Sequence, residues 1–334
     1  MNQPILLAYL DHNVLNTMLK GDPHSIGDLL KKLNLTPVFS DENLAEIHRS
    51  KGYEERFLNH LERIDALYLS PILDAQLKHT GEAEFQKINP FDAYKNYVEN
   101  MDDIPESDFG FKGMLQKLYG GLQDRSFEEI FASAAKDIDE LIEEVREELQ
   151  GAHDASDQVS GVEETFKNLQ EGLREQFGYI GTQLDAEPRA GVVQFQEATQ
   201  LGPLLLNNVK GPDVVRKIWA LLESSFPADI EVDIETFLGI KPFSYEADAD
   251  RERTRVEKVN GIYHQLNFLG YYRDSGMKNT NRLTASLSDM THAGLASFCH
   301  VLICRDERFV MKASAAYEYL GVGPLILHYR DNVI

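Results

Sequence analysis

The sequence predicts an α/β protein with three layers, α/β/α, around a mainly parallel central sheet, and with an all-helical insertion. Short apolar runs alternate with amphipathic segments at both ends of the 334 residues, which is the pattern of a doubly wound sheet. The middle of the chain shows helical spacing instead. We therefore expect one discontinuous domain, residues 1–75 and 265–334, and an acidic helical insertion, residues 76–264.

The first end supplies three expected strands. Ile5 to Leu10 is a continuous apolar run, as expected for a strand that is buried on both faces, and it stops at Asp11. The other expected elements, in chain order, are a helix at 27–33, a strand at 36–39, a helix capped by Ser40, a helix at 53–64 and a strand at 66–69.

The second end begins with a helix that we expect Ser288 and Asp289 to open. The elements expected after it are a strand from His300 to Cys304, Asp306, a helix that ends near Gly321, and a last strand at 324–328. Asp289 and Asp306 then lie at chain reversals, at the carboxyl edge of the parallel sheet. Ligands of open α/β folds bind at this edge.

Most of the acidity lies in the middle of the chain. Residues 1–75 carry 11 acids and 7 bases, and 265–334 carry 6 acids and 7 bases, so the insertion holds −19 of the net charge of −22. Two runs with apolar residues at steps of three and four, 127–150 and 162–177, predict an antiparallel helical hairpin. We expect this hairpin to have an acidic solvated face and to mediate homo-oligomerisation or bind a protein partner.

Several classes of protein are excluded. The chain lacks a phosphate-binding Gly-x-x-x-x-Gly-Lys loop, a dinucleotide fingerprint after its first strand, a His-Glu-x-x-His motif and a Gly-x-Ser-x-Gly elbow. Its two cysteines, Cys299 and Cys304, exclude a disulfide framework. No apolar stretch approaches the length of a membrane helix, and the first residues do not resemble a secretory signal, so we expect a cytoplasmic protein without membrane contact.

Four acids are expected at one edge of the sheet. Asp11 and Asp306 follow strands, while Glu46 and Asp289 belong to helices. Carboxylates gathered in one cleft repel one another unless a cation neutralises them, and hard oxygen ligands select Mg²⁺ or Mn²⁺. The chemistry that such a cluster usually serves is phosphodiester hydrolysis.

The runs LLAYLDHNVLN, SDENLAEI and SDMTHAGLASFCHVLICRDERF, taken together, resemble the PIN domain, a family of metal-dependent nucleases. The resemblance covers the two ends and leaves the middle unassigned. The residues that match its four motifs are Asp11 with Asn13, Glu46 with Ser40, Asp289 with Ala293, and Asp306 with Arg308 and Phe309.

This resemblance implies a hydrolase, an RNA endonuclease in which metal-activated water attacks the phosphodiester. All four acids would be catalytic and metal-binding, with Asp11 and Asp306 holding the cation, and nucleic acid would be the partner, RNA rather than DNA. The chain departs from the family pattern at His12 and Cys304, where hydroxyl residues are common. The alternative is therefore a catalytically weakened PIN-like scaffold that serves as a partner-binding or regulatory module.

Substrate contacts are expected around the acids. The resemblance implies such roles for Asn13 and Ser40. His292, one helical turn after Asp289, is expected either to position a water or phosphate or to be a structural histidine. The basic residues expected to form a phosphate-facing rim are Arg273, Lys278, Arg282, Arg305, Arg308 and Lys312. Tyr271 and Tyr272 could stack bases, although such an aromatic cluster is more often core.

Overall fold

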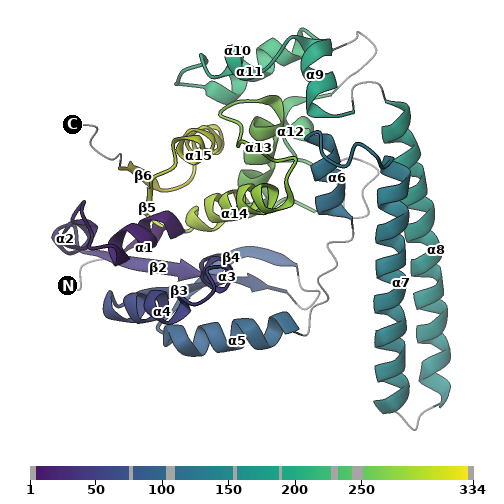
Figure 1. The fold of residues 1–334 in the computed structure, drawn as a ribbon, viewed down its shortest axis with the longest axis horizontal. Helices are drawn as coiled ribbons and strands as arrows, with labels where there is room; N and C mark the ends of the chain where they lie inside the picture. Colours follow the sequence, from purple (N-terminus) through teal and green to yellow (C-terminus); the bar gives the residue numbers. More distant parts are fainter. Residues whose placement is uncertain are drawn as a thin grey trace. The chain divides into compact units, whose positions relative to one another are not determined.

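The protein is described here from a computed structural model of residues 5–74, 78–102, 110–152, 156–187, 190–226, 232–242 and 251–329 (Figure 1). Contacts divide the chain into two compact units. The first takes its residues from Met1–Asn100, Leu201–Asp274 and Ser286–Ile334, and the second from Met101–Gln200 and Ser275–Ala285.

A six-stranded, mostly parallel sheet forms the centre of the first unit. Its strands are β1 (Leu6–Leu10), β2 (Leu35–Ser40), β3 (Leu67–Leu73), β4 (His79–Gln86), β5 (Val301–Cys304) and β6 (Leu325–His328). They lie in the order β4-β3-β2-β1-β5-β6, and only β3 and β4 are antiparallel. Because β1 to β4 extend to one side and β5 and β6 to the other, the strand order reverses between β1 and β5.

Helices pack against this sheet as the alternation of its side chains requires. Ala8 and Leu10 of β1 point into an apolar cluster that they share with the helices of the N-terminal part, whereas Tyr9 points to the opposite face and contacts His292. The helices that follow β1, β2 and β4 are α1 (His12–Leu19), α2 (Ile26–Lys32), α3 (Asp41–Arg49), α4 (Glu54–Arg63) and α5 (Pro90–Asp102). The arrangement is compatible with the predicted three layers.

The remaining helices of the first unit come from the second half of the chain. They are α10 (Pro203–Leu206), α11 (Val214–Glu223), α12 (Ile234–Phe237), α13 (Arg255–Leu269), most of α14 (Thr280–Ala296) and α15 (Glu307–Leu320). Helix α11 holds the only tryptophan, Trp219, whose ring centroid lies 5.9 Å from that of Phe226 and 5.5 Å from that of Phe237. This residue is therefore a natural fluorescent reporter of the first unit.

The second unit is helical in its described part. Its helices are α6 (Phe111–Leu118), α7 (Phe127–Ala152), α8 (Ser156–Ala186) and α9 (Val192–Thr199). The predicted hairpin is present, since the start of α7 meets the end of α8 where the Asp185 carboxylate accepts from the N–H of Phe127 at 2.9 Å. Further along, Arg174 donates to Asp139 at 3.1 Å, so the two helices run antiparallel (Figure 1).

Two expectations need correction. Residues 76–264 are not all helical, because β4 adds an antiparallel strand to the central sheet and pairs Tyr68 with Gln86. The alternating charged and neutral residues of this edge strand leave no apolar run for sequence reasoning to detect. Asp289 does not open a helix either: α14 begins at Thr280, after Asn279, whose side chain accepts from the N–H of Asn281. Asp289 therefore lies well inside α14.

Within the described residues, none of the helices combines the length and the apolar character that crossing a bilayer would require.

Asn43 joins the ends of the two central strands. Its Nδ2 donates to the carbonyl of Leu10 at 3.1 Å, and its Oδ1 accepts from the N–H of Ser40 at 3.0 Å. The residue is fully buried, so no water can replace these bonds. Asn43 thus fixes how β1 and β2 end, which is where the candidate site begins.

We predict that Asn43→Ala lowers the free energy of unfolding of the first unit by about 1–3 kcal/mol, because it leaves two buried backbone groups unpaired. Urea denaturation followed by Trp219 fluorescence measures this loss. The matched control is Asn59→Ala on the exposed face of α4, which should change stability by less than about 0.5 kcal/mol. Equal effects in the two variants would contradict this role.

Candidate metal centre

The site lies at the carboxyl edge of the sheet, beside the reversal of strand order. Asp11 directly follows β1, and its N–H still donates to the carbonyl of Ile303 in β5 at 3.1 Å. Asp306 comes two residues after the end of β5. The prediction that these two aspartates flank the switch point of the sheet is therefore confirmed by the topology.

Three side chains meet at this edge. Asp11, Glu46 of α3 and His292 of α14 each offer a donor atom, and these atoms all lie within 4.8 Å of one another. The Nε2 atom of His292 is 3.0 Å from Oε2 of Glu46. Asp11 is 2% exposed and His292 is fully buried, while the Glu46 side chain remains 20% exposed. Asp11 and His292 are thus shielded from solvent, and solvent reaches the cluster on the Glu46 side.

Side chains of the sheet hold the imidazole of His292 in place. Its Nδ1 is 2.7 Å from the Tyr9 hydroxyl, which is also 2.7 Å from Oγ of Ser40. Ser40 is 1% exposed, so its expected contact with substrate is replaced by this structural contact with Tyr9. The hydroxyl chain from β2 through β1 orients His292, as partners behind a metal ligand commonly do.

The cluster has unusual electrostatics. Burial raises the pKa of Asp11 to about 6, although the charge of His292 opposes this change. Burial disfavours a charged His292, but the hydrogen bond and charge of Glu46 outweigh it and raise the pKa of His292 to about 9. Burial likewise opposes ionisation of Glu46, yet the contacts with His292 hold the pKa of Glu46 below its usual value. The histidine therefore compensates part of the acidic charge.

The donor set fits a divalent cation. Oδ2 of Asp11 is buried and has no hydrogen-bond partner among the residues described, and such an oxygen is costly to leave unsatisfied. Two carboxylates and an imidazole are common ligands of Mn²⁺ and related ions. His12, which stands where a hydroxyl was expected, stacks its ring on Phe57 at 4.7 Å and places Nδ1 3.7 Å from Oε2 of Glu46.

A basic residue that sequence reasoning missed lies beside the cluster. The Arg49 guanidinium is 3.9 Å from Oε1 of Glu46 and 3.6 Å from Oε1 of Glu42. It also donates to Oγ of Ser288 at 3.2 Å, and Ser288 donates to Glu42 at 2.5 Å. Arg49 is one helical turn after Glu46, and this spacing in the sequence could have indicated that the two side chains lie close together.

Asp289 belongs to a second group of charges. Burial and then the charges of Asp11 and Asp274 raise the pKa of Asp289 well above its usual value. Lys312 lies in the same region, fully buried, with Nζ 2.7 Å from Oδ2 of Asp274 and 3.1 Å from Oδ1 of Asn267. Lys312 was expected on a phosphate-facing rim, but its burial in an ion pair rules out that position.

Asp306 is exposed and caps α15. Its Oδ1 accepts from the N–H of Arg308 at 2.7 Å and from that of Phe309 at 3.1 Å. Its charge still acts on Asp11, where it raises the pKa of the buried carboxyl. Asp289 and Asp306 thus lie near the cluster, although their oxygens are not among the three donors that come together.

The other expected substrate contacts are found in different surroundings. Asn13 is exposed, and its side chain hydrogen-bonds to Asp11. Arg305 and Arg308 are exposed on either side of Asp306. Arg273 is not on an open rim, because its guanidinium donates to the carbonyls of Asn267 at 2.9 Å and of Phe268, near the end of α13. The two remaining basic residues, Lys278 and Arg282, are exposed in the second unit.

Tyr271 is fully buried and Tyr272 is half-buried, with an edge contact of 5.0 Å between their ring centroids. The core interpretation therefore holds for Tyr271.

Comparison with known proteins adds no assignment, since no family model matches the chain and no curated protein or solved structure is significantly similar to it.

The charge of His292 predicts how stability depends on pH. Its pKa is raised from the ordinary 6.5 to about 9, so the stabilising contribution is complete below pH 6.5 and is lost as the pH rises through 9. In EDTA we expect wild type to lose on the order of 3 kcal/mol more than His292→Gln across this interval. Urea denaturation followed by Trp219 fluorescence at several pH values measures the difference.

The control for this experiment is His79→Gln, which removes an exposed histidine of β4 and should follow the wild-type profile. A His292→Gln protein with the same pH profile as wild type would show that His292 is not charged in the folded state.

Proposed function

We propose that the protein is a metal-dependent nuclease that hydrolyses phosphodiester bonds, with RNA as its substrate. The observation that supports this proposal most is the meeting of Asp11, Glu46 and His292 within 4.8 Å at the switch point of the sheet. The resemblance of both ends of the chain to the PIN domain points the same way. The proposal also places the protein in the cytoplasm, where RNA is available.

In this proposal the three clustered side chains hold one cation. Asp11 would supply its buried, unpartnered oxygen, Glu46 a carboxylate oxygen, and His292 its Nε2 atom, which would give up its proton and its hydrogen bond to Glu46. Tyr9 orients the imidazole, Asp306 adds negative charge close by, and Asp289 lies near as a carboxyl group whose pKa is raised. A cation bound here would lower the pKa of a water molecule and stabilise charge on the leaving oxygen.

The nature of the ligands suggests which cation is preferred. Carboxylates alone suit Mg²⁺, whereas an imidazole adds affinity for transition metals. Because His292 is one of the three candidate donors, we propose Mn²⁺ as the preferred ion, and Mg²⁺ as the weaker one.

The surroundings suggest how a nucleic acid would be held. Arg49 lies beside Glu46, and the exposed Arg305 and Arg308 flank Asp306, so positive charge lies near the acids. We further propose that the acidic hairpin of α7 and α8 contacts a protein partner or a second copy of the chain, because its net charge of −11 over residues 124–175 disfavours nucleic acid.

A second candidate function is a metal-free binding or regulatory module. It is favoured by His292, whose two ring nitrogens are both hydrogen-bonded and whose raised pKa of about 9 lets the imidazolium offset part of the acidic charge without a cation. In that case no cation is needed to relieve the repulsion between Asp11 and Glu46. The effect of Mn²⁺ on thermal stability and the cleavage of RNA separate the two candidate functions.

Mn²⁺ should stabilise the wild-type protein and should do so through the cluster. A ligand that binds only the folded state adds RT ln(1 + [L]/Kd), about 2.7 kcal/mol at a hundredfold excess over Kd. We expect Mn²⁺ to raise the thermal midpoint reported by Trp219, and the increase to shrink in Asp11→Asn and His292→Gln. Asp92→Asn, an exposed control on α5, should keep the full increase.

Equal increases in all four proteins would place the cation elsewhere, for example on the acidic hairpin. No increase in any of them would favour the metal-free module.

Nuclease activity should depend on Asp11. Asp11→Asn should cleave a fluorescent single-stranded RNA at least about 100-fold more slowly than wild type in Mn²⁺, since even residues that only support a ligand cost 10- to 100-fold. Its apo stability should equal or exceed that of wild type, because one carboxylate of a crowded pair has lost its charge. Wild-type cleavage by Asp11→Asn, or full activity in EDTA, would contradict the proposal.

A further inference from the structure

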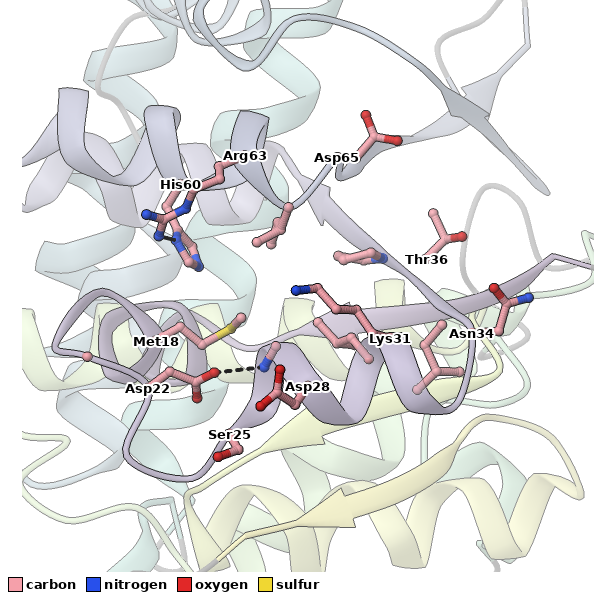
Figure 2. Close-up of a pocket in the computed structure, with 16 residues that line it drawn as sticks. Met18, Asp22, Ser25, Asp28, Lys31, Asn34, Thr36, His60, Arg63 and Asp65 are labelled. Carbon is pink, nitrogen blue, oxygen red and sulfur yellow. Dashed lines mark hydrogen bonds between the residues drawn. The ribbon is translucent and has the colours of Figure 1, made fainter.

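A cavity lies at the edge of the sheet opposite to the metal cluster. It has a volume of about 740 Å³ and is bounded by the end of α1, by α2, by the start of β2 and by the end of α4 (Figure 2). Leu35 lies at this edge and Ser40 at the edge of the metal cluster. Five steps along a strand separate them by about 17 Å, so the cavity is not part of the cluster.

His60 gives this cavity an unsatisfied donor. The Arg63 guanidinium lies 2.6 Å from Nδ1 of His60. Because a guanidinium can only donate, Nδ1 must be the acceptor, and in the neutral ring the proton is on Nε2. Burial and then the charge of Arg63 lower the pKa of His60, which favours the neutral ring.

The Nε2–H group has no acceptor among the residues described, although its atom is buried and His60 is only 5% exposed. A buried donor without an acceptor costs about 1–3 kcal/mol. Figure 2 shows the His60 ring on the cavity side of α4, with the Lys31 side chain extending from α2 towards the same space. An acceptor supplied by a ligand would satisfy this group.

The lining of the cavity carries charges of both signs. Lys31 and Arg63 bring two positive charges, and Asp22, Asp28 and Asp65 bring three negative charges. Two of the lining acids are engaged: Asp22 accepts from the N–H groups of Ile26 at 2.7 Å and Gly27 at 2.8 Å, and Asp65 forms an ion pair with Lys87.

Part of the remaining lining is apolar and can contact an uncharged group. Apolar side chains contribute to the wall, namely Met18, Leu30, Leu35, Pro37 and Ile64. A volume of this size accommodates a small organic molecule. His60 and Lys31 offer two separate donors, and the Arg63 guanidinium lies against His60, an arrangement that a phosphate monoester with three oxygens can use.

We infer that this cavity binds a small phosphate monoester of nucleotide size, whose phosphate accepts from His60 Nε2–H and from Lys31 and whose ring system lies on the apolar wall. The ligand site is independent of the proposed nuclease activity.

Calorimetric titration of the full chain with AMP, adenosine and inorganic phosphate tests this inference. EDTA is present throughout, so that binding through a cation is excluded. We expect AMP to bind at least tenfold more tightly than either adenosine or phosphate, because only AMP fills both parts of the cavity.

Two variants locate the binding. His60→Phe keeps the ring volume without the N–H, and Lys31→Met removes an exposed charge that is not needed for folding; each should weaken AMP binding at least tenfold. The control is Lys32→Met, the exposed neighbour on α2 that does not line the cavity, which should bind as wild type does. Unchanged AMP affinity in Lys31→Met, no AMP binding to wild type up to millimolar concentration, or equal affinities for AMP and either fragment would overturn the inference.

Discussion

The hydrogen-bonded pair of Glu46 and His292, at 3.0 Å, is the interaction on which the candidate site depends. It joins α3, which follows β2, to α14, which precedes β5, and so connects residues that are 246 positions apart in the sequence. Asp11, at the end of the strand between β2 and β5, completes the group. An uncompensated pair of carboxylates in this buried place would be costly, and the imidazole offsets part of that cost.

The pairing of the strands brings Asp11, Glu46 and His292 together. Parallel pairing of β1 with both β2 and β5 brings their carboxyl ends to one edge, and Asn43 fixes the ends of β1 and β2. The hydroxyl of Tyr9 then reaches His292 from the face of the sheet opposite to Ala8 and Leu10. The geometry of the site is therefore determined mainly by strand pairing and side-chain alternation and depends little on the conformation of loops.

Much of this framework could be predicted from the sequence, because buried parallel strands read as continuous apolar runs. The strand β4 could not be predicted, since an edge strand with alternating charged residues has no apolar signature. The concentration of acidic charge in residues 76–264 wrongly suggested that this segment is all helical. The role of His292 was only partly visible from its spacing to Asp289. Lys312 was misplaced because its partner, Asp274, lies 38 positions away and charge alone suggests exposure. The sequence alone does not show which side chains pair across distant segments.

The central claim is that Asp11, Glu46 and His292 share one divalent cation. A crystal structure of the protein grown with Mn²⁺, with diffraction recorded at the manganese absorption edge, tests it most directly. The account predicts one anomalous peak bonded to Oδ2 of Asp11, to a Glu46 oxygen and to Nε2 of His292, with the contact between Glu46 and His292 lengthened. An intact contact with no peak among the three side chains, or a peak found only on the acidic hairpin of α7 and α8, would contradict it.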